Sequence, residues 1–153
     1  MLQVRRYGER GPLVVVLHGG PGAPGSAGGL ARGLAPRCRV LEPWQRRRED
    51  APLTVAQHVA DLDELLDTLD EPPALVGHSW GAMLGLVYTA EHPDRVARLA
   101  LVGGGTWDTT ARARIGEILA ARTTPELQTQ LDRLETDYPD PDQRLQRAYE
   151  LTH

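Results

Sequence analysis

Short apolar runs divide the first part of the chain, and each has the length of a β-strand. Residues 2–7 alternate between apolar and polar positions, which is typical of a strand in the outer part of a sheet. Residues 13–17 form a continuous and largely β-branched run, which indicates a parallel strand covered on both faces. The runs at 39–42, 74–76 and 96–102 predict further strands.

Segments with helical spacing separate these runs. Small residues predict a helix that reaches about residue 35, and an almost wholly apolar helix follows the run at 74–76. Thr54 can cap a helix that extends to about residue 69. The apolar stripe of that helix consists of Val55, Val59, Leu62, Leu65, Leu66 and Leu69. Because strands alternate with helices, the sequence predicts an α/β fold with a doubly wound, mostly parallel sheet and right-handed crossovers.

The pattern changes after three consecutive glycines at 103–105. The remaining residues are more polar, and no apolar run among them suggests another strand. Helical spacing recurs at 111–122, 125–137 and 142–151. We therefore expect two parts, an α/β unit at 1–105 and a helical unit at 106–153.

The stretch that points to chemistry is the pentapeptide Gly77-His78-Ser79-Trp80-Gly81, between a predicted buried strand and a predicted apolar helix. A G-x-S-x-G pattern in this context is typical of a serine nucleophile on a sharp turn. Such a turn is strained, and glycine two residues to either side of the serine relieves the crowding. The N-terminus of the following helix favours developing negative charge. The alternative is that Ser79 only caps the helix.

A loop rich in glycine and proline, residues 18–26, follows the β-branched run. It contains a G-x-G-x-x-G pattern from Gly20 onward, and Glu42 lies about 20 residues further on, which is the outline of a dinucleotide-binding fingerprint. Pro21 and Pro24 remove amide donors that would hold a pyrophosphate, and the chain has no lysine to complete a Walker loop. In an acyl-transfer enzyme, the same loop would supply a backbone N–H donor to an oxyanion.

Composition narrows the classes of function. The net charge of −4 argues against non-specific binding of nucleic acid. The single cysteine, Cys38, excludes an internal disulfide, and no residues have the spacing of a metal-ligand cluster. No run is long and apolar enough for a signal peptide or a membrane span. We therefore expect a cytoplasmic protein with no metal, no cofactor and no membrane partner.

Two motifs, His-Gly-Gly-Pro-Gly at 18–22 and Gly-His-Ser-Trp-Gly at 77–81, occur together in this chain. Together they resemble the α/β-hydrolase superfamily, and within it the prolyl iminopeptidase-like branch. The stretches at 58–62 and 92–96 are also similar to that branch, and the resemblance covers residues 13–105. It implies hydrolysis of esters or amides, including the release of N-terminal proline, with a small molecule or a short peptide as substrate.

The resemblance implies roles for three residues. Ser79 would be the nucleophile, and the backbone N–H groups of Gly20 and Trp80 would form the oxyanion hole. The helices after residue 105 would begin the cap domain above the active site. Where prolyl iminopeptidases carry Asp-Gln-Arg-Gly-type residues, this chain has Pro-Trp-Gln-Arg-Arg-Arg at 43–48, so iminopeptidase specificity does not follow.

A second departure concerns the catalytic acid and base. In these hydrolases an acid and then a histidine follow the serine in the chain. Only His92 and His153 follow Ser79, one at a predicted helix end and the other at the last residue. Asp108 lies beyond a predicted strand, where it could orient a histidine or cap a helix. We therefore expect the N-terminal part of a longer hydrolase, broken inside the cap domain, without the acid and base of the triad and with little activity alone.

The run at 96–102 should form an uncovered apolar sheet edge through which copies could associate. His58 shares a helix face with apolar residues, so we expect it in the core and not as a metal ligand. The main alternative function is a catalytically silent α/β-hydrolase-like scaffold that binds a ligand or a partner. A dinucleotide-binding domain is the second alternative.

Overall fold

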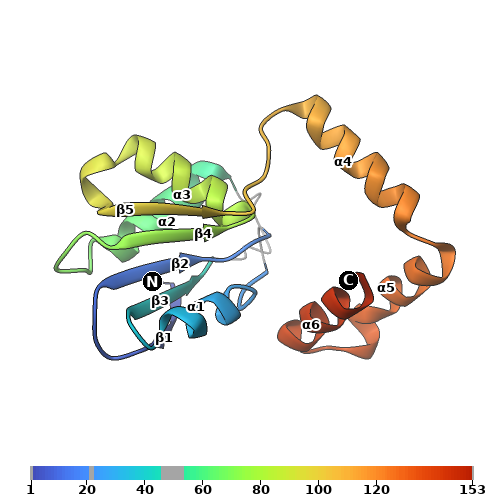
Figure 1. The fold of residues 1–153 in the computed structure, drawn as a ribbon, viewed down its shortest axis with the longest axis horizontal. Coiled ribbons are helices and arrows are strands. Elements are labelled where there is room, and N and C mark those ends of the chain that lie inside the picture. Colours follow the sequence, from blue (N-terminus) through green and yellow to red (C-terminus); the bar gives the residue numbers. More distant parts are fainter. Residues whose placement is uncertain (1, 21–22, 46–53, 153) are drawn as a thin grey trace. The chain divides into compact units, whose positions relative to one another are not determined.

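The computed structural model describes residues 2–20, 23–45 and 54–152. Part of the glycine-rich loop, the arginine-rich stretch at 46–53 and His153 lie outside the described residues. The strands are β1 (Gln3–Tyr7), β2 (Leu13–Leu17), β3 (Arg39–Trp44), β4 (Ala74–His78) and β5 (Arg98–Val102) (Figure 1). The helices are α1 (Gly28–Leu34), α2 (Val55–Leu66), α3 (Trp80–Glu91), the short 3₁₀ turn η1 (Pro93–Arg95), α4 (Thr109–Arg122), α5 (Pro125–Asp137) and α6 (Pro141–Thr152).

The described strands form one sheet in the order β1-β3-β2-β4-β5. β1 runs antiparallel to β3 at one edge, and the other neighbouring strands pair in parallel. The predicted mostly parallel sheet is therefore confirmed. Within it, Leu17 at the end of β2 pairs with Gly77 of β4. Because both strands end at the same edge of the sheet, the segments that follow them, residues 18–20 and Ser79, emerge as neighbours.

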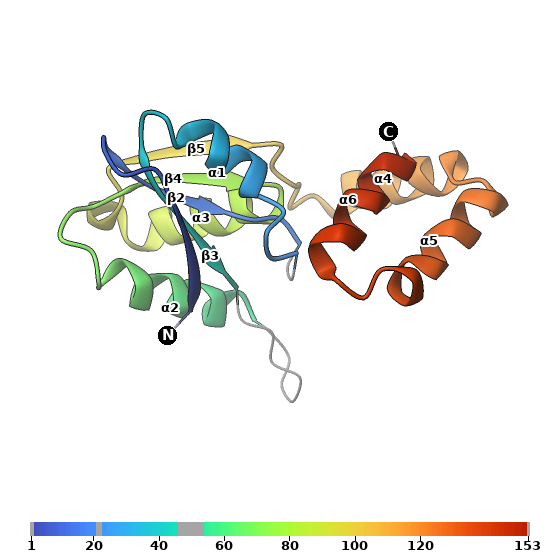
Figure 2. The same ribbon diagram turned by 90° about the horizontal axis from the view of Figure 1, so that it is seen from below.

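Helices cover both faces of the sheet, as Figure 2 shows for α1 on one side and for α2 and α3 on the other. Alternate residues of β2 explain this arrangement, because successive side chains of a strand point to opposite faces. Val14 and Val16 pack with Ala31 of α1. Val15 and Leu17 belong to the cluster that includes residues of α2 and α3. The doubly wound arrangement predicted from the sequence is confirmed.

Two details differ from the sequence prediction. β3 continues through Pro43 to Trp44, beyond the predicted end of the strand. Proline fits there because the pairing of β3 with β2 ends at Leu41, so no ladder bond to β2 needs the missing N–H. Val55, which the predicted apolar stripe includes, is 40% exposed because it is the first residue of α2. The helix ends at Leu66, one turn earlier than predicted.

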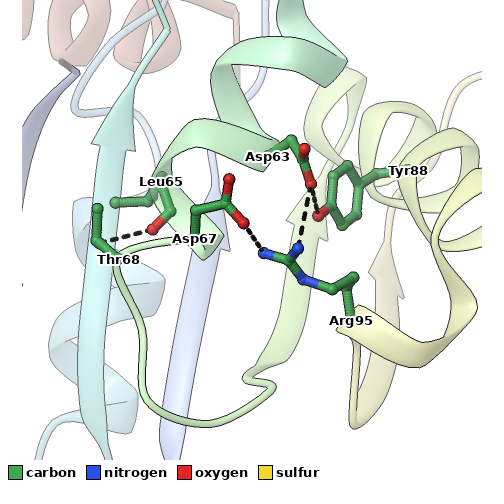
Figure 3. A network of polar contacts seen from close by, with 6 residues as sticks. All are labelled: Asp63, Leu65, Asp67, Thr68, Tyr88 and Arg95. Atoms are coloured by element: carbon green, nitrogen blue, oxygen red, sulfur yellow. Dashed lines mark hydrogen bonds and ion pairs between the residues drawn. The ribbon is translucent and has the colours of Figure 1, made fainter.

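Polar contacts join α2, α3 and η1 (Figure 3). The Tyr88 hydroxyl donates a hydrogen bond of 2.7 Å to Asp63. The Arg95 guanidinium lies 2.6 Å from Asp67 and 4.0 Å from Asp63. Burial, together with the hydrogen bond to Asp63, raises the pKa of Tyr88, so the phenol remains a donor. These contacts fix α3, the helix that starts immediately after Ser79.

β5 forms the second edge of the described sheet, and its apolar side chains are open to solvent. Leu101 is 50% exposed and Val102 is 41% exposed. β5 pairs with β4 on one side, through residues 98–102. The exposed apolar edge expected at 96–102 is therefore present, and association through it stays a prediction.

Contacts divide the chain into two compact units, residues 1–105 and 106–153. In the second unit, α5 and α6 pack together, and α4 has no buried side chain. Asp108 is the N-cap of α4, where its carboxylate accepts hydrogen bonds from the backbone N–H groups of Thr110 and Ala111. Asp108 is therefore a helix cap. That this unit begins a cap domain stays a prediction. Across the described ranges, no helix combines the length and the apolar character needed to cross a membrane.

Candidate active site

Ser79 occupies the turn between β4 and α3 in an unusual backbone conformation. Its φ is 53° and its ψ is −115°. Among the described residues it is the one non-glycine residue with positive φ. A side chain in this region costs about 1–3 kcal/mol and persists where the surroundings impose it, often at functional sites. The predicted strained turn is therefore present at Ser79.

Both glycines of the pentapeptide are required by close backbone approach. A Cβ on Gly77 would lie 2.2 Å from the carbonyl oxygen of Gly81. A Cβ on Gly81 would lie 2.2 Å from the carbonyl oxygen of Leu17 in β2. The crowding that the sequence predicted around these glycines is therefore present. The atoms that crowd them belong to the start of α3 and to the end of β2, and not mainly to Ser79.

The hydroxyl of Ser79 does not serve α3 as a cap. Ser79 occupies the N-cap position, but its side chain makes no capping hydrogen bond. Instead, its backbone carbonyl accepts bonds from the N–H groups of Ala82 and Met83, and its own N–H donates to Val102 of β5 at 2.9 Å. Hydrogen bonds therefore hold the backbone of Ser79 on both sides. Its side chain is half-buried and makes no capping bond to α3. The alternative of a merely capping serine does not hold.

The loop after β2 lies against this serine. A Cβ built on Gly19 would be 3.4 Å from the Cβ of Ser79, which is van der Waals contact. The N–H of Gly19 donates to the hydroxyl of Ser26 at 3.3 Å, which holds the loop from its far side. Two segments that are far apart in sequence are therefore adjacent, as the oxyanion-hole hypothesis requires.

Hydrogen bonds to the buried His18 set the orientation of this loop. The backbone N–H of Gln45 donates to Nε2 of His18 at 3.1 Å, so Nε2 is an acceptor and the ring proton is on Nδ1. Nδ1 then donates to the carbonyl of Gly19 at 2.7 Å. In a planar trans peptide, the N–H points opposite to the carbonyl. The N–H of Gly20 is therefore directed away from the His18 ring.

Trp80, the other predicted donor, is the first residue of α3. N–H groups in the first turn of a helix lack intrahelical partners, and the helix dipole adds positive potential there. The indole Nε1 of Trp80 donates to the side-chain oxygen of Gln45 at 3.0 Å. Its ring packs edge-to-face with His58, at a centroid distance of 5.7 Å. The roles of Gly20 and Trp80 as oxyanion donors stay predictions.

His58 and His92 have surroundings other than the Ser79 hydroxyl, whereas His78 directly precedes Ser79 and is exposed. His58 is 3% exposed, as predicted for a core residue, and burial lowers its pKa, so the neutral ring is favoured. His92 lies beside the ring of Tyr88 at 4.8 Å between centroids. Within the described ranges, no imidazole is hydrogen-bonded to Ser79, and no group of three or more potential metal ligands is present.

Gln45 is a residue of the site that the sequence did not predict. Gln45 is 7% exposed and bonds to both halves of the site. Its place shortly after the strand predicted at 39–42 is a weak local signal, which does not identify its partners. Glu42, the candidate ribose ligand, is fully buried and accepts a hydrogen bond of 2.6 Å from Tyr7. This burial argues against the dinucleotide alternative.

Comparisons with known proteins agree with this geometry. The model of the α/β hydrolase fold family matches residues 12–119. A probable proline iminopeptidase of Streptomyces coelicolor is 40% identical over 110 residues, which cover 63% of this chain and 34% of that protein. A cis-3-alkyl-4-alkyloxetan-2-one decarboxylase of Shewanella oneidensis is 32% identical over 108 residues, which cover 64% of this chain and 34% of that protein.

A solved structure is similar over most of the chain. It is a hydrolase from Pseudomonas aeruginosa, with a TM-score of 0.63 and 24% identity, and the match covers 92% of this chain and 60% of that one. At this identity the likeness shows the fold alone. The chain spans about a third of the length of the two curated relatives above.

Proposed function

Since this chain belongs to the α/β-hydrolase fold family, as its two motifs predict, we propose that it is the nucleophile-bearing part of a serine hydrolase. The observation that carries the proposal is the turn at Ser79, which holds a half-buried hydroxyl in a strained conformation beside Gly19. Strain of this kind is maintained where it positions a reacting group. Ser79 is the catalytic nucleophile in this account.

The proposed reaction is acyl transfer through a covalent intermediate. The Ser79 oxygen attacks the carbonyl carbon of the substrate, and the carbonyl oxygen becomes an oxyanion. The backbone N–H groups of Gly20 and Trp80 stabilise that charge. The serine proton passes to a base and then to the leaving group, and water later releases the acyl group. No metal or cofactor takes part.

In our proposal this chain lacks the acid and base of the triad. His18, His58 and His92 contact other groups, and His78 directly precedes Ser79 in the chain, which places its ring poorly to accept the serine proton. Loss of a triad member leaves a residual acceleration of roughly 10³–10⁴-fold over water, from the oxyanion hole and binding alone. We therefore expect weak turnover of esters and no efficient release of proline from peptide amides. Rapid turnover of a prolyl amide by this chain alone would contradict this part of the proposal.

The substrate is a small ester or the amide of a short peptide, and the location is the cytoplasm. Support for a peptide substrate is the likeness to a probable proline iminopeptidase. The likeness to a decarboxylase of a lactone-type substrate supports a wider range of carbonyl compounds.

A second candidate function is a catalytically silent scaffold that binds a ligand. The observation that favours it is the lack, in the described residues, of a hydrogen bond between Ser79 and a histidine. Such a scaffold would hold Ser79 without backbone N–H donors placed to stabilise an oxyanion. The two candidates therefore differ in the reactivity of Ser79 toward reagents that form tetrahedral adducts.

Labelling with a fluorophosphonate tests this difference. The serine oxygen bonds to phosphorus, fluoride leaves and the proton passes to solvent. The chain has two serines, Ser26 and Ser79, so Ser26 is an internal control. We expect a slow adduct confined to Ser79 in peptide mass spectra, and none in Ser79→Ala. Equal labelling of both serines, or labelling of neither, would favour the silent scaffold.

A further inference from the structure

Gln45 connects the two segments that would supply the oxyanion donors. It follows β3 and is almost fully buried. Its side-chain nitrogen donates to the carbonyl of His18 at 3.4 Å, and its side-chain oxygen accepts from the indole of Trp80 at 3.0 Å. His18 begins the loop that contains Gly20. One amide side chain thus spans from the loop after β2 to the first residue of α3.

The chemistry of the two partners requires an amide at this position. An indole N–H can only donate, and a backbone carbonyl can only accept. A glutamine side chain presents one acceptor and one donor group, so it satisfies both partners at once. A carboxylate of the same shape would place an oxygen against the carbonyl of His18, and an apolar side chain would satisfy neither.

The backbone of Gln45 contributes a separate link. Its N–H holds His18 in the tautomer that donates to the carbonyl of Gly19, and this bond sets the direction of the Gly20 N–H. Side-chain substitutions at position 45 keep that N–H. They therefore test the link between Trp80 and the loop without removing the link that selects the tautomer.

We propose that Gln45 is a positioning residue, whose side chain fixes the loop of Gly20 relative to Trp80 so that the two backbone N–H groups converge on one oxyanion. This inference rests on the proposed function. Donors from two separate elements must be held within about 0.5 Å of the productive geometry. Three bonds from one buried residue supply that restraint.

The decisive variant is Gln45→Glu, compared with Gln3→Glu on the exposed part of β1. At pH 8 the carboxylate repels the His18 carbonyl, and the donors separate. We expect fluorophosphonate labelling of Ser79 to slow by about tenfold to a hundredfold, a part of the loss known for removal of a whole oxyanion donor. Gln3→Glu should label at the wild-type rate. An unchanged rate in Gln45→Glu would overturn the proposal.

Two further variants separate positioning from general damage. Trp80→Phe keeps the backbone N–H but loses the indole N–H, so it should slow labelling similarly. The double variant, Gln45→Glu with Trp80→Phe, should label no more slowly than the slower of the two single variants. Lowering the pH protonates the new carboxyl group, which can then donate to His18. The deficit of Gln45→Glu relative to wild type should therefore shrink in acid. Additive effects and a pH-independent deficit would contradict the proposal.

A measurement without reactivity keeps this inference distinct from the proposed function. In ¹H–¹⁵N spectra of the full chain, Gln45→Glu should shift both the Trp80 indole signal and the backbone amide signal of Gly20. If wild type fails to label at Ser79 but both signals shift, the proposed function fails and the coupling through Gln45 stands. If the Gly20 signal stays in place, Gln45 does not position the loop, whatever the labelling shows.

Discussion

At the scale of single residues, the site depends on the absence of side chains as much as on their presence. Gly77 and Gly81 let the start of α3 and the end of β2 approach the turn closely. Ser79 itself adopts a conformation that non-glycine residues rarely accept. The position of its hydroxyl is thus set by packing of backbone against backbone, which is rigid.

Gly81→Ala tests this packing directly. The added methyl group would lie 2.2 Å from the Leu17 carbonyl oxygen, and backbone atoms cannot yield as a flexible side chain does. We expect a loss of about 3 kcal/mol or more in the free energy of unfolding, at the upper end of overpacking costs, measured by urea denaturation.

The matched control is Gly33→Ala on α1, where nothing lies within 4 Å of the added methyl group. Alanine in a helix interior gains about 1 kcal/mol over glycine at most, so this variant should be neutral or slightly more stable. Equal stability of the two variants would show that the close approach at Gly81 is wrong.

At the scale of elements, α3 begins directly after Ser79, the proposed nucleophile, so the anchoring of this helix matters. The hydrogen bond from Tyr88 to Asp63 joins α3 to α2, and Arg95 adds exposed ion pairs from η1 (Figure 3). Tyr88 is fully buried, whereas the side chains of Arg95 and Asp67 are 38% and 63% exposed. The partly buried bond from Tyr88 to Asp63 should therefore contribute more to stability than the ion pairs of Arg95.

Tyr88→Phe should lower the free energy of unfolding by about 1.5–3 kcal/mol, because the bond is to a charged group. Arg95→Met should cost clearly less than Tyr88→Phe, because exposed ion pairs are screened by solvent and contribute little. Since folding raises the pKa of Tyr88, the folded state keeps its proton longer than the unfolded state. Wild-type stability should then fall as the pH rises above 10, and fall less in Tyr88→Phe. A larger loss of unfolding free energy in Arg95→Met than in Tyr88→Phe, measured by urea denaturation, would contradict this account.

The elements were largely predictable because their signals are local. The β-branched run at 13–17 and the G-x-S-x-G turn each identify themselves within a few residues. Gln45 was not predictable, since its partners His18 and Trp80 are distant in the sequence and meet only when β2, β3 and β4 align. The roles of Gly20 and Trp80 as oxyanion donors came from a resemblance and stay predictions.

At the scale of the whole molecule, the open edge of the sheet is the main feature. In the sheet of the described residues, β5 is an edge strand, and its Leu101 and Val102 are exposed. Edges of this kind promote pairing between molecules. We expect copies of the chain to associate through it.

Leu101→Lys tests that expectation, because a charged side chain blunts an edge strand. The weight-average mass of wild type in analytical ultracentrifugation should rise with concentration, and Leu101→Lys should reduce the rise. Val55→Lys, which adds the same charge at an exposed position of α2, should not. A wild type that is monomeric at every concentration would exclude this association.

The central claim is that Ser79 faces two backbone N–H donors from different segments. The most direct measurement is a crystal structure of the fluorophosphonate adduct. We predict phosphorus bonded to the Ser79 oxygen and one phosphonyl oxygen about 2.7–3.1 Å from the backbone nitrogens of both Gly20 and Trp80. An adduct whose oxygen points to solvent, or a Gly20 N–H turned away from it, would contradict the account.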